Sequence, residues 1–204
     1  GQNTPSIKVN AVRDRGAKVV LHGDNYDEAS QHAKTLCEAQ GLVYIPPYDD
    51  VDVIAGQGTI GMEIVNQHSE PLDAIFVPVG GGGLVAGVAA YVKYLHPQIK
   101  IIGVEAQGSN CLDAAIRAGR RVRLPIDQLD LFADGVSVTQ IGKETFKVAK
   151  KYVDDVVVVN VDEICAAIKD VFEDTRCVAE PAGALAIAGM KRYVDAHPGM
   201  SHVV

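Results

Sequence analysis

The sequence predicts an α/β fold in which an open, mostly parallel sheet carries helices on both faces. Two observations predict it. Short apolar runs rich in Val and Ile alternate with segments of at least about ten residues whose apolar positions have helical spacing. The run at 156–159 consists of valines alone, which is typical of a parallel strand buried on both faces. We expect right-handed crossovers between successive strands.

The first part of the chain predicts one strand and two helices. Residues 18–22 form a short strand candidate, and a helix follows over 25–40, capped by Asp24 or Asn25 and stopped by Gly41. Residues 42–45 are another short apolar run, which ends at two prolines. Apolar spacing then predicts a helix over 51–67.

The rest of the chain alternates strand and helix. We expect strands over 74–79, 99–104 and 153–159, and helices over 84–95, 109–118, 142–152, 162–172 and 181–196. Asp162 is the expected cap of one helix, and Pro181 the expected first residue of the last. The long irregular segment over 119–141 indicates a functional or interface role.

Composition excludes several classes of partner. The chain has 204 residues, is 48% hydrophobic and 22% charged, and carries a net charge of −7. Its basic residues are dispersed, so no nucleic-acid partner and no anionic membrane surface is expected. The uncharged run over 74–92 is long enough to span a bilayer, but Pro78 and the glycines after it interrupt any helix there. We therefore predict a buried strand followed by a buried helix.

Cysteine and histidine spacing predicts no metal site. The four cysteines are widely separated, without a CxxC pair, which is typical of reduced thiols in a cytosolic protein. The six histidines show neither an HxxxH nor an HExxH pattern.

Four consecutive glycines, Gly80–Gly83, lie between the strand at 74–79 and the helix at 84–95. Ligands of open α/β sheets bind beyond the carboxyl ends of the strands. Backbone N–H groups of such a loop, together with the first turn of the next helix, form an anion site, and phosphate is its natural guest. A tight packing turn between strand and helix explains one or two glycines rather than four.

The glycine run by itself does not identify the ligand. Residues 81–86 satisfy the G-x-G-x-x-A pattern of dinucleotide sites, and Glu105 lies where the ribose-binding acid would be. An NAD-dependent oxidoreductase is therefore one alternative. A non-catalytic module that binds phosphate or an amino acid is another.

Longer stretches of the sequence bear on which ligand the glycine run binds. The sequence resembles the pyridoxal-phosphate enzymes of fold type II, the tryptophan synthase β class, and within them the biosynthetic threonine dehydratases. The matching stretches run colinearly over most of the chain and include Thr4-Pro-Ser-Ile-Lys-Val9, Val53-Ile-Ala-Gly-Gln-Gly-Thr59, Val77-Pro-Val-Gly-Gly-Gly-Gly-Leu84, Leu131-Phe-Ala-Asp-Gly-Val136 and the stretch over 172–185.

The resemblance implies pyridoxal 5′-phosphate as cofactor. Its phosphate would be held by the backbone N–H groups of Gly80, Gly81, Gly82, Gly83 and Leu84. The implied reaction converts L-threonine, or L-serine, into a 2-oxo acid and ammonia; with threonine the product is 2-oxobutanoate, in the first step of isoleucine biosynthesis. A homotetramer is implied, in the cytoplasm or, in a plant or fungus, in an organelle.

The resemblance also implies what the chain lacks. The family's Schiff-base lysine lies in a Ser-x-Lys-x-Arg motif that this sequence does not contain, and Lys8 is interpreted as an ordinary helix lysine. No catalytic residue is assigned. We expect a fragment of a longer enzyme, inactive alone, with residues 1–55 from a smaller domain and 56–204 from the larger, phosphate-binding one.

Three further positions are weaker candidates. Glu180 would approach the cofactor, although a carboxylate at the start of a helix explains it without chemistry, and the turn over 134–136 would line the site through its backbone. Relatives similar to serine racemase carry a divalent-cation site near Glu105, but Cys111 replaces a carboxylate there, so no metal is predicted.

Overall fold

The computed structural model describes residues 1–204, and the chain forms two compact units, Gly1–Ile45 and Pro46–Val204. The glycine run lies in the second unit. The assignment of residues 1–55 to a smaller domain and 56–204 to a larger one stays a prediction.

The first unit contains two helices, α1 (Ser6–Arg13) and α2 (Tyr26–Gln40). Asn25 caps α2 by accepting a hydrogen bond from the backbone N–H of Glu28, and Gly41 ends the helix in the left-handed conformation. The strand predicted at 18–22 is wrong, and the apolar run at 42–45 forms no strand either. A strand requires a paired neighbour, and the sheet of this chain contains no pairing partner for these residues.

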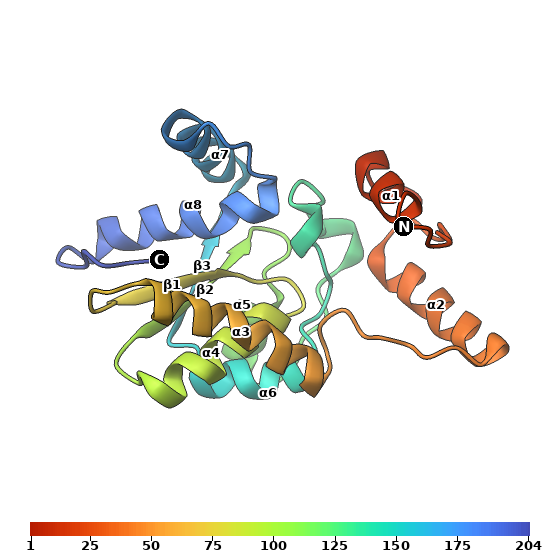
Figure 1. Ribbon diagram of the computed structural model, residues 1–204, viewed down its shortest axis with the longest axis horizontal. Coiled ribbons are helices and arrows are strands. Elements are labelled where there is room, and N and C mark those ends of the chain that lie inside the picture. Colours follow the sequence, from red (N-terminus) through yellow and green to blue (C-terminus); the bar gives the residue numbers. More distant parts are fainter. The chain divides into compact units, whose positions relative to one another are not determined.

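The second unit is built on a parallel sheet of three strands, β1 (Ala74–Pro78), β2 (Lys100–Ala106) and β3 (Asp155–Val159), in the order β1-β2-β3 (Figure 1). Ala74 is paired with Lys100 at the start of β1, and Ile102 with Asp155 at the start of β3. The three strands expected here are confirmed, with ends that differ by one or two residues.

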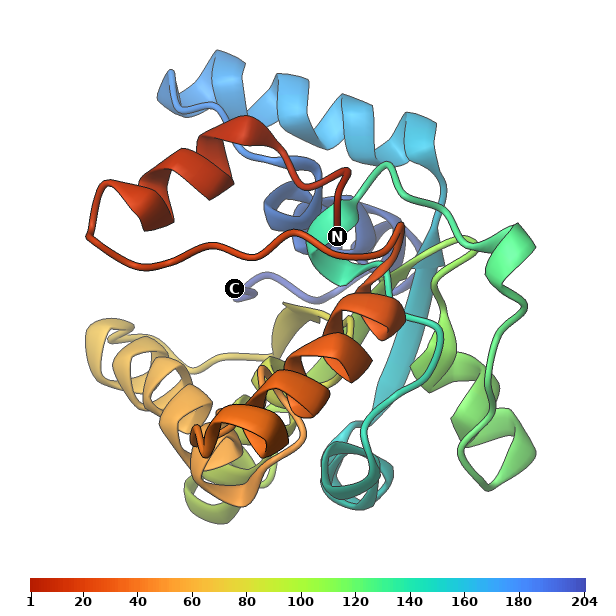
Figure 2. The same ribbon diagram turned by 90° about the vertical axis from the view of Figure 1, so that its right-hand side faces the viewer.

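Helices cover both faces of this sheet, as predicted (Figures 1 and 2). They are α3 (Val51–Gln67), α4 (Gly83–Leu95), α5 (Cys111–Ala118), α6 (Lys143–Tyr152), α7 (Val161–Thr175) and α8 (Pro181–Ala196). Helix α8 packs on all three strands from one face, with α7 beside it. The other face is covered by α4 and α5, and α3 and α6 pack against α4. None of these helices combines the length and the apolar character that crossing a bilayer requires.

Two helix starts test the capping predictions. Pro181 is the first residue of α8, as predicted. Helix α7 is capped by Asn160 rather than Asp162: the Asn160 side chain accepts a hydrogen bond from the N–H of Glu163, whose carboxylate binds the N–H of Asn160 in return. The irregular segment over 119–141 contains two short 3-10 helices, η1 (Ile126–Gln128) and η2 (Asp134–Val136).

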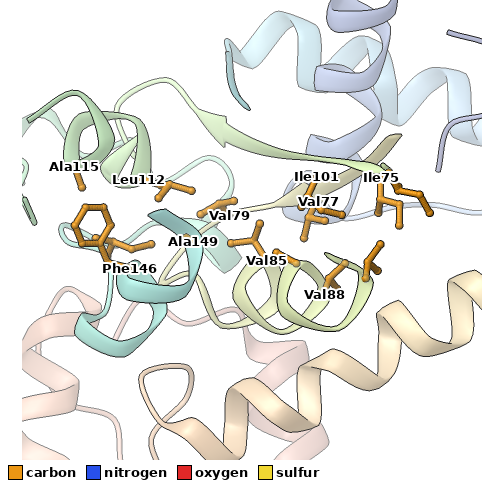
Figure 3. Packing of buried hydrophobic residues seen from close by; sticks show 14 of the residues in the cluster. Ile75, Val77, Val79, Val85, Val88, Ile101, Leu112, Ala115, Phe146 and Ala149 are labelled. Carbon is orange, nitrogen blue, oxygen red and sulfur yellow. The ribbon is translucent and has the colours of Figure 1, made fainter. Parts of the chain in front are cut away.

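The core consists of two layers of apolar side chains, one on each face of the sheet. Ile75 and Val77 of β1 point to the layer that contains Val88 of α4 (Figure 3), whereas Phe76 points to the layer that contains Leu185 of α8. Successive side chains of a strand alternate between faces, so a strand covered on both sides is apolar throughout. Because β1 is buried on both faces, its carboxyl end is held in place, and the glycine run follows directly after it.

Candidate functional site

The glycine run connects the carboxyl end of β1 to the first turn of α4. The N–H of Val79 still donates to the carbonyl of Val104 in β2, at 2.8 Å. The chain then leaves the sheet at Gly80, and α4 begins at Gly83. Gly82 has φ +92°, a conformation that favours glycine.

The N–H groups of residues 80–85 donate no hydrogen bond to any group of the chain. Those of residues 83–85 belong to the first turn of α4, where a helix has no acceptor of its own. Gly82 and Gly83 are nevertheless buried. Buried N–H groups are almost always paired, so this row of donors indicates an acceptor from outside the chain.

The carbonyl groups of the same loop are, by contrast, all held by the protein. The carbonyl oxygen of Gly80 accepts a hydrogen bond from Cys111 Sγ at 3.4 Å. That of Gly81 accepts two, from the N–H of Gly142 at 3.1 Å and from Thr145 Oγ1 at 2.7 Å.

The carbonyl oxygen of Gly82 accepts the first hydrogen bond of α4, from the N–H of Ala86 at 3.0 Å. The C=O and N–H of a trans peptide unit point in opposite directions. Each held carbonyl therefore turns the following N–H to the other side of the loop. These N–H groups lie at the positive end of the α4 dipole, an arrangement typical of anion sites.

Packing leaves little room for a side chain at the four glycines. A Cβ atom would lie under 3.0 Å from another protein atom at Gly80, Gly81 and Gly82, and at 3.0 Å at Gly83. These atoms belong to Val136 for Gly80, to Tyr48 for Gly81 and Gly83, and to Ile141 for Gly82. Close packing against backbone or a ring is thus clearest at Gly80 and Gly81. What indicates a ligand is the row of unpaired donors rather than the number of glycines.

Glu105 has a structural role at the start of α5. Its side chain is fully buried, and it accepts hydrogen bonds from the N–H groups of Leu112 at 2.7 Å and Asp113 at 2.8 Å. Asn110, the residue before α5, makes no capping bond with its own side chain, so Glu105 caps this helix instead. Burial raises the pKa of Glu105 to about 8. The acid that the dinucleotide alternative requires is thus not available to a ribose, and that alternative loses its support.

Cys111 connects Glu105 to the glycine loop. Its thiol is fully buried, and burial raises its pKa, so the sulfur stays protonated and donates to Gly80. The chain contains no group of three or more His, Cys, Asp or Glu side chains placed to hold a metal ion.

The weaker candidates lie on neighbouring elements. Val136, in the turn over 134–136, packs directly against Gly80. A Cβ added at Gly135 would lie 3.6 Å from Glu180 Oε1, so Glu180 is next to that turn.

Lys8 is a residue of helix α1, as predicted, in the first unit.

The contact between Asp49, in the segment before α3, and the start of α6 was not predicted from the sequence. The carboxylate of Asp49 accepts hydrogen bonds from the N–H groups of Lys143 and Glu144, both at 2.8 Å. Gly142, at the N-cap of α6, has no side chain that could do this. The glycine at the N-cap indicates that another residue must cap this helix. That residue, Asp49, lies more than 90 positions earlier in the chain and cannot be identified from the sequence pattern.

Two solved enzyme structures share this architecture. The processed form of threonine deaminase isoform 2 from Solanum lycopersicum superposes with a TM-score of 0.92 at 46% identity, over 100% of this chain and 59% of that one. Serine racemase from Dictyostelium discoideum gives 0.85 at 33% identity, over 99% and 64%. The fold is that of the fold type II pyridoxal-phosphate-dependent enzymes.

The family follows from the sequence as a whole. The profile of the pyridoxal-phosphate-dependent enzyme family matches residues 1–204, and the chain belongs to this family. It is 57% identical to the biosynthetic L-threonine dehydratase of Pasteurella multocida over 96% of its own length, and 55% identical to that of Escherichia coli over 95%. The resemblance to biosynthetic threonine dehydratases is confirmed. The chain spans 38% and 37% of these two relatives.

Proposed function

We propose that this chain forms the phosphate-binding part of a pyridoxal-phosphate-dependent L-threonine ammonia-lyase. The observation that carries the proposal is the row of unpaired N–H groups over residues 80–85, at the carboxyl edge of the sheet. A phosphate dianion matches this row, because it accepts several hydrogen bonds and the α4 dipole favours negative charge.

The backbone of Gly80, Gly81, Gly82, Gly83 and Leu84 would hold the phosphate of the cofactor. No side-chain charge is needed, since short charge-assisted hydrogen bonds to N–H groups stabilise the anion. When bound, pyridoxal phosphate supplies an electron sink for the substrate's Cα. The chain contributes the anchor that keeps the cofactor in one orientation.

The substrate is proposed from the relatives. The curated relatives at more than 50% identity are named threonine dehydratases, which supports L-threonine and its conversion to 2-oxobutanoate and ammonia, in isoleucine biosynthesis. A fungal L-serine ammonia-lyase has the same fold at 26% identity, so L-serine is the comparison substrate. The intact enzyme is proposed to be a homotetramer, in the cytoplasm or, as the names of chloroplastic and mitochondrial relatives suggest, in an organelle.

The 204 residues are proposed to be inactive alone. The sequence contains no Ser-x-Lys-x-Arg motif for a Schiff-base lysine, and Lys8 belongs to a different stretch. Covalent attachment of the cofactor requires such an amine.

The test compares the protein from the complete reading frame with the 204-residue chain. We expect the complete protein to release 2-oxobutanoate from L-threonine, dependent on added pyridoxal phosphate and faster than pyruvate from L-serine. The 204-residue chain should release neither. A complete protein that binds the cofactor without forming either product would contradict the lyase assignment, and one that does not bind the cofactor would contradict the phosphate site.

A further inference from the structure

Thr145 connects helix α6 to the glycine loop. It lies in the first turn of α6, its side chain is fully buried, and its Oγ1 donates to the carbonyl oxygen of Gly81 at 2.7 Å. The N–H of Gly142, just before the helix, donates to the same oxygen at 3.1 Å. A single loop carbonyl thus receives two donors from the start of one helix.

These two bonds fix the direction of an N–H group on the other side of the loop. The carbonyl of Gly81 and the N–H of Gly82 belong to the same planar peptide unit and point in opposite directions. Glycine has little conformational preference of its own, so the orientation of this unit depends on what its carbonyl contacts. Two donors on the carbonyl also polarise the unit and make its N–H a stronger donor.

Thr145 is in turn held in place by Asp49. The Asp49 carboxylate accepts hydrogen bonds from the N–H groups of Lys143, Glu144 and Thr145, at 2.8, 2.8 and 3.3 Å. It replaces the side-chain cap that Gly142 cannot provide, and helix ends without a cap fray. The first turn of α6, which carries the Thr145 hydroxyl, therefore depends on Asp49.

The residue before Asp49 reaches the same loop. A Cβ at Gly81 would overlap the ring of Tyr48. The segment that precedes α3 thus contacts the glycine loop through Tyr48 and fixes the helix that holds the loop through Asp49.

We propose that Thr145 and Asp49 are positioning residues of the phosphate site. Thr145 holds the Gly81 carbonyl, and Asp49 holds the helix turn that carries Thr145. Together they aim the N–H of Gly82 at the phosphate without contacting it. This inference rests on the proposed function, because it requires that the loop binds the cofactor's phosphate.

The first test uses Thr145→Val and Thr145→Ser in the complete protein. Valine has nearly the shape of threonine but no hydroxyl, whereas serine retains the donor. The dissociation constant of pyridoxal phosphate is measured by titrating the apoprotein. We expect Thr145→Val to raise it at least about fivefold, the effect of one lost hydrogen bond, and Thr145→Ser to change it less than about twofold. Pyridoxal, which lacks the phosphate, should bind the wild type and Thr145→Val equally well.

The second test uses Asp49→Asn and the ³¹P resonance of the bound cofactor. The amide retains one acceptor oxygen but loses the charge. We therefore expect a dissociation constant of pyridoxal phosphate between those of the wild type and Thr145→Val, and a shifted ³¹P resonance. A purely structural role would lower the unfolding temperature without moving the ³¹P resonance or the affinity ratio of pyridoxal phosphate to pyridoxal.

The outcomes separate the two proposals. Wild-type protein that fails to bind pyridoxal phosphate would overturn the proposed function, and this inference with it. Wild-type binding with an unchanged dissociation constant in Thr145→Val would overturn the inference alone. So would a Thr145→Ser variant that binds as weakly as Thr145→Val, or an equal loss for pyridoxal.

Discussion

The carboxylate of Glu105 accepts a hydrogen bond from the backbone N–H of Leu112 at 2.7 Å, in a fully buried environment. This contact joins the end of β2 to the first turn of α5. The next residue back, Cys111, donates to Gly80. The buried thiol thus connects the start of α5 to the glycine loop, and Thr145 connects the start of α6 to it.

The buried acid predicts a pH dependence of stability. Burial raises the pKa of Glu105 from 4.5 in the unfolded chain to about 8. Between these values the native state binds the proton more tightly, so unfolding releases it and the free energy of unfolding falls as the pH rises. The contribution of Glu105 is fully present below about pH 4.5 and is lost as the pH rises through about 8.

Urea unfolding at about pH 6 and about pH 8.5 checks this prediction. Glu105→Gln should be less stable by about 1–3 kcal/mol at the lower pH, since an amide leaves one of the two N–H groups unpaired. Its stability should also change less between the two pH values than that of the wild type. Glu70→Gln, at an exposed position, is the matched control. Equal pH dependence in Glu105→Gln and wild type would contradict the assignment.

The cysteines should differ sharply in reactivity. Cys165 and Cys177 are exposed, whereas the Cys111 thiol is buried and its pKa is raised. With iodoacetamide under native conditions, we expect alkylation of Cys165 and Cys177 and none of Cys111 until denaturant is added. Peptide mass spectrometry identifies the labelled sites. Rapid native labelling of Cys111 would show that the loop is open to solvent from that side.

A methyl group at Gly81 should disrupt the loop. It would overlap the Tyr48 ring, and overpacking of this kind costs about 1–3 kcal/mol. Gly81→Ala should therefore lower the free energy of unfolding by that amount and weaken the binding of pyridoxal phosphate.

Gly56→Ala provides the control. Gly56 lies on α3, and a Cβ there meets no atom within 4 Å. The same substitution should therefore stabilise the chain, by about 0.5–1 kcal/mol, and leave cofactor affinity unchanged. A Gly81→Ala variant with wild-type stability and affinity would mean that the ring does not lie on the loop.

The sheet was predictable because two of its strands contain uninterrupted apolar runs, at 74–78 and 156–159, although only Val159 of the second run is fully buried. The run at 18–22 has a similar composition but no partner strand, and composition carries no information about pairing. Glu105 stands at a strand end, where a ribose-binding acid and a helix cap look alike in sequence. Only the structure distinguishes these two roles, because it places the N–H groups of Leu112 and Asp113 on the Glu105 side chain.

The least predictable part of the site is its support. Asp49 and Thr145 are 96 positions apart, and neither belongs to a motif. Each is an ordinary polar residue until the fold brings a carboxylate to an uncapped helix and a hydroxyl to a loop carbonyl. The glycines could be located from sequence, but the contacts that orient their N–H groups could not.

The most direct test of the central claim is an NMR titration of the complete protein labelled with ¹⁵N-glycine. Pyridoxal phosphate is added, and the amide proton shifts of the glycines are followed. The amides of Gly80, Gly81, Gly82 and Gly83 should move downfield as their N–H groups become hydrogen-bonded to phosphate, while those of Gly56 and Gly119 should stay in place. Cofactor binding that leaves these four resonances unmoved would contradict the claim that the glycine loop holds the phosphate.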